Sequence, residues 1–506
     1  MGNRIRILAT GDVRGRISPY NDADGLSEYK GFARLSTLID ALRDEDTIVV
    51  DNGNALQGSA LMYYHALNNA EAESPVTAVM NHIGYDYVNL GNHDFDSGMH
   101  VLCDHLERLS APCITSNLNY KGKPFCPTYV ITETAGKKIA LFGLITPQTF
   151  RLEKRANVRG CRFLSALETA KKTVRLIRDL EKPDYIICLY HGGLERDPAS
   201  GYPTETLTGE NEAYALLREV RGIDLLITGH QGRSLCGTLF NTVYTQTAGE
   251  GAELACIDIY TDTGVIEPRI LKADCEPDEE ILSLCENAQN DCDAWLNEQI
   301  GVCGSDLEIK DETDARMNKS QFITFVNQTL MELTGAQIAA VPLYPGAHGL
   351  HQEIAMRDLI TSFPYADTVT VKKITGKVLK EYLEQSASFW SIRNDAVVVS
   401  PAFVTPVKKY ELYDMADGIE YTIRVSEDPG HRIENLTYQG QPVEDDMEFE
   451  FVTTGYRAYG NGGYDMLKEC PYVSDIKQPL AMILADYIRD HQAVSFEPVH
   501  NIHVVR

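Results

Sequence analysis

The stretch Leu90–Gly98, LGNHDFDSG, decides how the rest of this sequence is interpreted. It follows an apolar run and brings Asn92, His93, Asp94 and Asp96 together within five residues. Asn, Asp and Gly are common in turns because they tolerate turn backbone angles, but a turn has no use for the histidine. We therefore ask whether His93 takes part in chemistry.

The length and composition restrict the class of protein. At about 150 residues per domain, 506 residues predict two to four domains. The 43% hydrophobic and 24% charged content is typical of a packed globular protein. A net charge of −27 would repel a nucleic-acid polymer, so we expect no such partner. A small anionic substrate stays compatible with this charge if its site carries a metal ion or an arginine.

The cysteine pattern and the apolar runs bear on location. The 12 cysteines are scattered without a CxxC pair, so we expect thiols in a reducing compartment and no structural zinc site. No run approaches the roughly 18 apolar residues of a membrane helix, and the first residues lack the apolar region of a signal peptide. We expect a cytoplasmic protein without a membrane partner, and the sequence makes no prediction of its oligomeric state.

The first half of the chain alternates short apolar runs with amphipathic helical patterns. Helical patterns cover 30–44 and 163–182. This alternation predicts a layered α/β domain, in which ligands bind beyond the carboxyl ends of the strands. The runs expected to form buried strands are 4–10, 46–52, 85–92, 113–118, 138–145, 185–193 and 224–232.

The alternation of apolar runs and helical patterns stops after about residue 272. A long acidic amphipathic pattern at 276–300 predicts a connecting helix. We therefore divide the chain into a first domain at 1–272, a connecting segment at 273–319 and a second domain of mixed strands and helices at 320–506.

Polar residues with metal-ligand chemistry follow five of the predicted strands. Carboxylate, amide and imidazole groups suit divalent transition metals, and separate strands could aim them at one point. Each residue alone is an ordinary loop residue, but the joint pattern is much harder to obtain by chance. The residues, in chain order, are Asp12, Asp51, Asn54, Asn92, His93, Asp96, His191 and His230.

At this point the sequence resembles the calcineurin-like metallophosphoesterases of the 5′-nucleotidase group. The resemblance is nearest to the branch of 2′,3′-cyclic-nucleotide 2′-phosphodiesterases/3′-nucleotidases. It implies a four-layer α/β/β/α metallophosphoesterase domain followed by an α+β 5′-nucleotidase C-terminal domain. Its motifs are ILATGDVRGRI (7–17), VVDNGNALQGS (49–59), NLGNHDFDSG (89–98), YHGG (190–193), ITGHQGR (227–233), YDMADGIEYTI (413–423) and TGYRAYGNGGYDML (454–467).

The resemblance implies roles for the strand-end residues. Asn92, His191 and His230 would hold one divalent ion, which could be Mn, Zn, Fe or Mg, and Asp12 would belong to the position of the other. His93 would stabilise charge on the phosphoryl group or protonate the leaving oxygen, and Asp96 would orient that histidine.

The metal motifs depart from the family pattern at three positions. The Asp-x-His motif ends here in Arg14, the bridging aspartate is replaced by Asn54, and the final His or Gln of the last motif is Gly232. Arg14 cannot ligate a metal, but its guanidinium can fork onto phosphate oxygens. We therefore expect one metal ion, with Asn54 offering it a neutral oxygen and Arg14 replacing the second ion.

Two functions of different classes follow from these departures. The first is metal-dependent hydrolysis of a nucleotide phosphoester, of the 5′-nucleotidase or the 2′,3′-cyclic phosphodiesterase/3′-nucleotidase type. The alternative is a nucleotide-binding protein with little or no hydrolysis. The intact pair of His93 and Asp96 favours the enzyme, because a binding protein has no evident need for it.

In the second domain, the resemblance places aromatic residues that stack on the nucleobase, an interaction worth roughly 1–3 kcal/mol per base. Here these would be Tyr413 and Tyr456, with Tyr410 and Tyr459 as near alternatives. Arg457 would contact the ribose or phosphate of the nucleotide.

Overall fold

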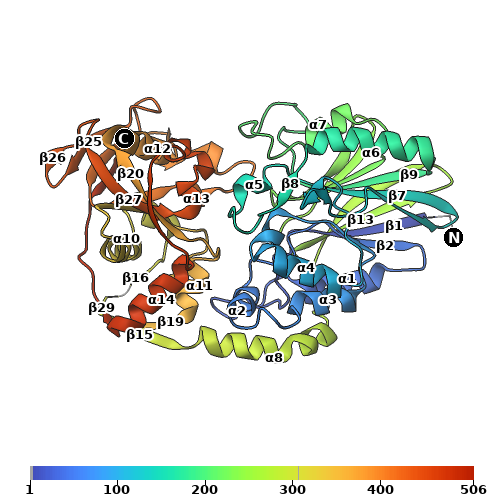
Figure 1. Cartoon of the computed structure of the whole chain (residues 1–506), viewed down its shortest axis with the longest axis horizontal. Helices are drawn as coiled ribbons and strands as arrows, with labels where there is room; N and C mark the ends of the chain where they lie inside the picture. The colour runs from blue at the N-terminus through green and yellow to red at the C-terminus, as the bar shows by residue number, and fades with distance from the viewer. Residues whose placement is uncertain (1–3, 306) are drawn as a thin grey trace. The chain divides into compact units, whose positions relative to one another are not determined.

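The computed structural model describes residues 4–305 and 307–506 of the chain. They form two compact units, which divide between Cys292 and Asp293 inside helix α8 (Glu279–Leu296) (Figure 1). This division falls within the segment that the sequence analysis assigns to a connector. Among the described residues, no helix is both long and apolar enough to cross a bilayer.

The first sheet of the N-terminal unit is built on β1, whose sequence RIRILAT is almost entirely buried. Strand β1 pairs with β2 in parallel and with β13 in antiparallel orientation. In spatial order the strands are β14 (Val265–Lys272), β13 (Glu253–Tyr260), β1 (Arg4–Thr10), β2 (Thr47–Asp51) and β3 (Tyr87–Val88).

The second sheet of this unit has a parallel centre, in which β7, β9, β10 and β12 run in the same direction. Its central strands are apolar on both faces, as expected for a sheet covered on both sides. In spatial order the strands are β11 (Leu235–Leu239), β12 (Thr242–Gln246), β10 (Leu225–Thr228), β9 (Tyr185–His191), β7 (Lys137–Ile145) and β6 (Val130–Thr134).

Successive side chains of β7 point to opposite faces of its sheet and show how the layers pack. Ile139 and Leu141 join the cluster between the two sheets, together with Ile7 of β1. Ala140 and Phe142 point the other way, into the cluster formed with the helices of the second sheet. Helices α1 and α3 lie along the first sheet and α6 and α7 along the second (Figure 1). The expected four-layer α/β/β/α arrangement is therefore confirmed.

The helical patterns at 30–44 and 163–182 form α1 and α6, but the run at 113–118 is largely not a strand. Cys113 makes an isolated bridge to Val88 and Thr115 makes one to Gly143, and continuous pairing begins only at Leu118. The remaining elements of the unit are α1 (Phe32–Leu42), α2 (Ala60–Asn68), α3 (Pro75–Ile83), η1 (Asn92–Phe95), α4 (Gly98–Arg108), β4 (Leu118–Tyr120), β5 (Lys123–Pro124), α5 (Thr149–Leu152), β8 (Cys161–Phe163), α6 (Ala166–Leu180) and α7 (Ala213–Glu219).

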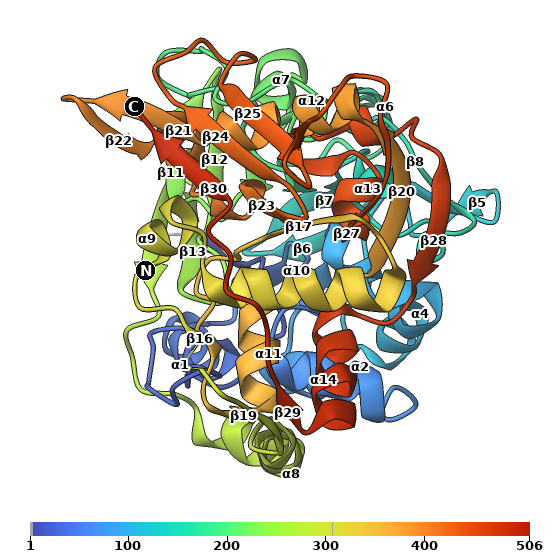
Figure 2. The same cartoon turned by 90° about the vertical axis from the view of Figure 1, so that its left-hand side faces the viewer.

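The C-terminal unit is built on a five-stranded sheet with α10 (Gln321–Thr334) lying across it (Figure 2). The Ser320 side chain caps the start of α10, and Gly335 ends it in a left-handed conformation. Its apolar face, which includes Phe322 and Val326, is buried. The sheet strands, in spatial order, are β23 (Asp414–Asp417), β17 (Ile338–Pro342), β27 (Glu448–Thr454), β20 (Val369–Thr375) and β28 (Tyr472–Ile476).

Smaller sheets complete the C-terminal unit. The segment 299–317, assigned to the connector by the sequence, contributes strands to this unit, because β15 pairs with β19 and β29. The remaining elements are β15 (Gln299–Cys303), β16 (Leu307–Glu308), α9 (Glu312–Met317), β18 (Gly349–Leu350), β19 (Glu353–Ala355), α11 (Met356–Ser362), α12 (Gly376–Ala387), β21 (Trp390–Arg393), β22 (Ala396–Val399), η2 (Pro401–Phe403), η3 (Tyr410–Leu412), β24 (Glu420–Arg424), β25 (Ile433–Tyr438), β26 (Gln441–Pro442), α13 (Gly455–Ala458), η4 (Asn461–Gly463), η5 (Asp465–Leu467), α14 (Leu480–His491), β29 (Ala493–Val494) and β30 (Ile502–Val505).

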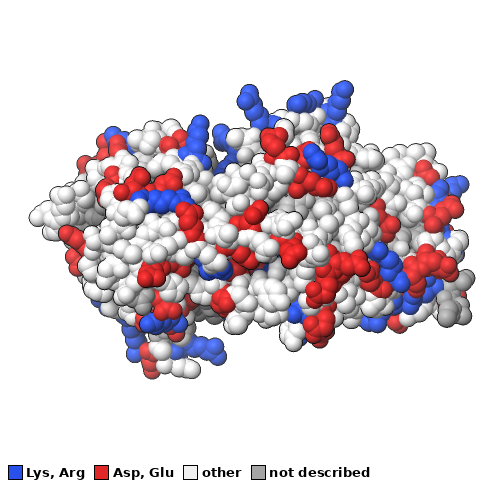
Figure 3. Space-filling model, turned by 90° about the horizontal axis from the view of Figure 1, so that it is seen from below, with Lys and Arg blue, Asp and Glu red and all other residues white. Residues whose placement is uncertain are grey.

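The acidic excess of the sequence is visible on the surface. On the face drawn in Figure 3, Asp and Glu side chains are widespread, and Lys and Arg side chains lie between them in small groups.

A buried ion pair in the C-terminal unit gives a stability prediction. Lys319 Nζ donates to Asp417 Oδ1 at 2.5 Å, and both side chains are almost fully buried. Replacing Lys319→Met leaves a buried carboxylate without its cation, so we expect the free energy of unfolding to fall by about 3–5 kcal/mol. Urea unfolding followed by circular dichroism measures this loss. The control Lys310→Met, in an exposed pair with Glu308, should change it by less than about 1 kcal/mol; equal losses in both variants would contradict the prediction.

Candidate active site

The carboxyl ends of the parallel strands bring the predicted polar residues together in the N-terminal unit. Asp12 Oδ1 accepts from Asn54 Nδ2 at 2.9 Å, and Asp12 Oδ2 accepts from the backbone N–H of His230 at 2.7 Å. His191 Nε2 lies 3.8 Å from Asp12 Oδ1, and Asn54 Nδ2 lies 3.5 Å from Asn92 Oδ1. The five side chains thus form one cluster, although 218 residues separate the first from the last.

The backbone of this cluster is strained. Asp12, Arg14, Asn54 and His230 have φ values of 54°, 57°, 60° and 71°, in the left-handed region. Asp, Asn and His enter this region more readily than other side chains, but it is uncommon for arginine. Such conformations cost about 1–3 kcal/mol each and collect at functional sites.

Asp94 is the residue of the opening motif that holds the loops together. Its buried carboxylate accepts hydrogen bonds from four backbone N–H groups, those of Asn54, Ala55, Leu56 and Gly91. The loop after β2 is thereby tied to the loop after β3. The two backbones approach so closely that a Cβ atom at Gly53 would collide with Gly91.

The two histidines of the cluster have defined hydrogen-bond partners. His191 Nδ1 donates to the backbone carbonyl of Asn52 at 2.6 Å, so Nε2 is the nitrogen with a lone pair. This Nε2 is buried and has no hydrogen-bond partner among the described residues. Burial lowers the pKa of His191 to about 4, so the imidazole is neutral at neutral pH. His230 Nε2 lies 2.9 Å from a carboxylate oxygen of Glu210.

Charge is concentrated around Asp12. Burial disfavours its carboxylate, but its electrostatic interactions with His191, Arg14 and His230 and the hydrogen bond from Asn54 outweigh burial, so the pKa of Asp12 is lowered. Burial also disfavours a charged His230, yet the hydrogen bond and charge of Glu210 outweigh this and raise the pKa of His230. The half-buried Arg14 therefore acts electrostatically on Asp12 and opposes a charge on His230.

The orientation of the Asn54 amide differs from the expectation. The backbone N–H of His93 lies 2.8 Å from Asn54 Oδ1. Since a backbone N–H can only donate, the side-chain atom facing it must be the amide oxygen. The Asn54 NH₂ group therefore faces the oxygens of Asp12 and Asn92. In this orientation Asn54 offers the cluster hydrogen-bond donors, and not the neutral oxygen that the sequence analysis predicts.

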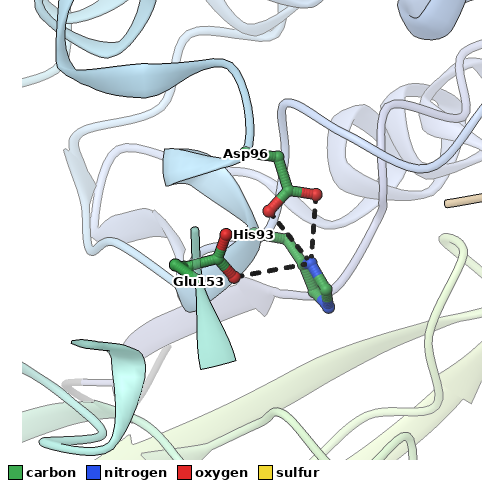
Figure 4. Close-up of side chains that lie close together, drawn as sticks. All are labelled: His93, Asp96 and Glu153. Atoms are coloured by element: carbon green, nitrogen blue, oxygen red, sulfur yellow. Dashed lines mark hydrogen bonds and ion pairs between the residues drawn. The ribbon is translucent and has the colours of Figure 1, made fainter. Parts of the chain in front are cut away.

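His93 belongs to a group of three side chains at the edge of the cluster (Figure 4). Its Nδ1 lies 3.2 Å from Asp96 Oδ2 and 4.0 Å from Glu153 Oε1. Burial, together with the charge and hydrogen bond of Asp96, raises the pKa of Glu153 well above its ordinary value. Asp96 is placed to orient His93, as the sequence analysis predicts.

Comparisons with known proteins match both units. The model of the calcineurin-like phosphoesterases matches residues 5–234, and that of the 5′-nucleotidase C-terminal domain matches residues 301–469. The chain belongs to the calcineurin-like phosphoesterases of the 5′-nucleotidase group. Relatives that match over nearly the whole chain are named phosphodiesterases and 5′-nucleotidases, so this chain is a hydrolase that acts on phosphoric ester bonds.

Individual relatives of this phosphoesterase span nearly its whole length. A 2′,3′-cyclic-nucleotide 2′-phosphodiesterase/3′-nucleotidase from Haemophilus influenzae is 26% identical, and the alignment covers 96% of this chain and 84% of the relative. A 5′-nucleotidase from Vibrio vulnificus is 24% identical, with 92% and 87% covered. The solved structure of a Staphylococcus aureus protein assigned as a 5′-nucleotidase, in complex with alpha-ketoglutarate, has a TM-score of 0.93 at 29% identity and covers 99% of both chains.

The donor set of this phosphoesterase fits a divalent ion. Asp12 Oδ1 and the orphaned His191 Nε2, 3.8 Å apart, are spaced like two ligands of an ion at about 2.1 Å from each. Asn92 Oδ1, 3.5 Å from Asn54 Nδ2, belongs to the same cluster and is a further oxygen donor. One ring nitrogen of each histidine has a hydrogen-bond partner: His191 Nδ1 contacts the carbonyl of Asn52, and His230 Nε2 contacts Glu210. Partners of this kind orient metal-binding imidazoles. Arg14, Asn54 and Gly232 stand where the family pattern described above has His, Asp and a final His or Gln.

Two residues predicted to contact the nucleotide are instead internal to the C-terminal unit. Tyr413 is fully buried and stacks on Phe389, with ring centroids 4.9 Å apart. Arg457 is 2% exposed, and its guanidinium forks onto both oxygens of Asp414 at 3.0 Å. Neither offers an exposed group to a ligand, so these two predictions require correction. The contact predicted for the half-buried Tyr456 stays a prediction.

Several residues of the site were not identified from the sequence. Glu153 ends the short helix α5, and Glu210 lies far along the loop between β9 and α7, so only the fold brings them to His93 and His230. Asn52 ends the predicted strand 46–52, and this position was the available signal, whereas Asn89 lies inside the predicted strand 85–92.

Asp51, at the end of β2, gives a pH prediction. It is buried, accepts from the Thr10 hydroxyl at 2.6 Å, and burial raises its pKa to about 7. Between the unfolded pKa near 3.8 and the folded pKa, the folded protein holds the extra proton, so its stability falls as pH rises through this window. The loss amounts to at most about 4 kcal/mol. Asp51→Asn should remove this component, as measured by urea unfolding of metal-free protein from pH 4 to 8.

The control for this experiment is Asp40→Asn, on the exposed side of α1. It should keep the wild-type pH dependence. An unchanged pH dependence in Asp51→Asn would show that Asp51 does not carry the effect.

Proposed function

We propose that this protein hydrolyses the phosphoester of a nucleotide with one divalent ion, and that Arg14 replaces the second ion of its family. The observation that carries the proposal is the pairing of a buried, unpartnered His191 Nε2 with Asp12, beside the charge of Arg14. When bound, the ion supplies Lewis acidity toward a phosphoryl oxygen.

The position of Arg14 supports its role. Its backbone N–H donates to the carbonyl of Asn54 at 2.8 Å, and its side chain passes close to Gly58 and Gly249, where a Cβ atom would meet it. These contacts support a side chain that acts on Asp12 and takes over the role of the second ion. A permanently charged guanidinium there repels a second cation and attracts phosphate oxygens.

His93 supplies the acid–base group of the proposal. The Asp96 carboxylate holds Nδ1, and Nε2 lies on the opposite edge of the ring. In this orientation His93 neutralises charge on the phosphoryl oxygens or gives a proton to the leaving oxygen. Glu153, whose Oε1 lies 4.0 Å from His93 Nδ1, is the second carboxyl group beside this edge of the ring.

The substrate class follows from the relatives. Nucleoside monophosphates and 2′,3′-cyclic nucleotides are the two candidates, because relatives from both named activities align over nearly the whole chain. In the C-terminal unit, Tyr456, Tyr410 and Tyr459 are the candidates for stacking on the base. Tyr459 is 48% exposed, and Tyr410 stacks with the guanidinium of Arg316 at 5.1 Å. We also propose that the protein acts in the cytoplasm.

The first experiment separates the enzyme from a nucleotide-binding protein. Metal content is measured by inductively coupled plasma mass spectrometry, and turnover is followed with p-nitrophenyl phosphate and bis-p-nitrophenyl phosphate in added Mn²⁺. We expect one equivalent of metal and turnover that is lost, by at least 100-fold, in His191→Ala and His93→Ala. Metal-independent binding of nucleoside monophosphates without turnover would instead support the binding protein.

The second experiment restores the missing ion. In Arg14→His/Asn54→Asp, two ligand types of the family return at positions whose left-handed backbone His and Asp tolerate. We expect Mn²⁺ stoichiometry to rise from one to two, as measured by isothermal titration calorimetry.

The matched control is Arg16→His, two residues along, whose side chain pairs with Glu28 and Glu250. It should leave the stoichiometry at one. A stoichiometry of two in the unmodified protein, or of one in the double variant, would contradict the proposed role of Arg14.

A further inference from the structure

Two cysteines of the N-terminal unit lie close enough to react with one another. The Sγ atoms of Cys113 and Cys126 are 3.2 Å apart, and the Cys126 thiol donates toward Cys113. A disulfide has its sulfur atoms about 2.05 Å apart, so a shift of roughly 1 Å would join them. Cys126 lies in the mostly exposed segment 121–128, which can supply this shift.

Cys113 is connected to the candidate active site by hydrogen bonds. Its Sγ lies 3.6 Å from Thr115 Oγ1, which donates to Asn89 Oδ1 at 2.7 Å. Asn89 Nδ2 donates to Asn52 Oδ1 at 3.0 Å. The backbone carbonyl of Asn52 accepts from His191 Nδ1. The chain of contacts from thiol to imidazole is therefore continuous.

The same connection reaches the loop after β3. The backbone N–H of Leu90 donates to Thr115 Oγ1 at 2.9 Å, and Leu90 precedes Gly91 and Asn92. Thr115 is fully buried, so a movement of Cys113 that displaces it has no empty space to occupy. Both His191 and Asn92 are thus sensitive to the position of Thr115.

We propose that Cys113 and Cys126 form a reversible disulfide that changes the geometry of the site through Thr115, Asn89 and Asn52. The oxidant is a small-molecule disulfide, RSSR. The Cys113 thiolate attacks one sulfur of RSSR and releases RS⁻, which takes up a proton. Cys126 then attacks Cys113 Sγ in the mixed disulfide, loses its proton and releases the second RSH. Two thiols are oxidised, and one RSSR is reduced to two RSH.

Formation of the disulfide is tested without any assay of activity. The protein is equilibrated in mixtures of oxidised and reduced glutathione, alkylated, and mapped by peptide mass spectrometry. We expect a Cys113–Cys126 crosslink that dithiothreitol removes. Absence of this crosslink in fully oxidised glutathione would overturn the proposal.

The coupling to the site is tested by hydrogen–deuterium exchange of the peptides that contain 50–56 and 187–193. We expect exchange in these peptides to change at least threefold on oxidation of the wild type and to stay unchanged in Cys126→Ser. The exposed Cys236→Ser should respond like the wild type. A crosslink without any change in exchange would overturn the coupling.

The effect on activity rests on the proposed function. If the reduced protein turns over aryl phosphates, we expect the oxidised wild type to lose at least fivefold in kcat/KM and the oxidised Cys126→Ser to lose none. Loss in both would overturn the coupling. Absence of turnover in the reduced protein would count against the proposed function, while the crosslink and exchange data would still decide the disulfide.

Discussion

The candidate site depends on one constraint, which is that the loops after β2 and β3 are locked together by the buried Asp94 carboxylate. Four backbone N–H groups donate to it, and they come from both loops. This bonding fixes the left-handed turn at Asn54 and the short helix that begins at Asn92. Two neighbouring groups are positioned in turn, because Asn54 accepts from the backbone N–H of His93 and donates to Asp12. Asp94 is therefore structural, and the chemical role of His93 stays a prediction.

The sequence predicted the layers of the first domain and the set of residues that gather at its strand ends. Both predictions rest on simple physics, since parallel strands present their carboxyl ends at one edge, and apolar runs specify which segments are buried. Asp12, Asn54, Asn92, His191 and His230 do lie together. Their role as metal ligands stays a prediction. The direction of the Asn54 amide could not be predicted, because it is decided by the N–H of His93.

Other features escaped prediction because they depend on packing. Tyr413 lies in a motif that resembles a nucleotide-binding segment, but the motif does not tell which side of the chain faces the core. In the structure its ring packs on Phe389. The guanidinium of Arg457 likewise pairs with the Asp414 carboxylate inside the unit. Glu210 reaches His230 from a loop whose composition is that of any exposed turn, so only the tertiary fold reveals it.

The hydrogen bonds of Asn52 have a consequence for chemical ageing. Asn52 precedes Gly53, and an asparagine before glycine loses ammonia readily when the following backbone nitrogen attacks its side-chain carbonyl. Here the Gly53 N–H is held by Asp51, and the Asn52 amide donates to two backbone carbonyls, those of Tyr190 and Ile227. Both partners of the cyclisation are held by these hydrogen bonds, so the folded protein disfavours deamidation at a position beside the candidate site.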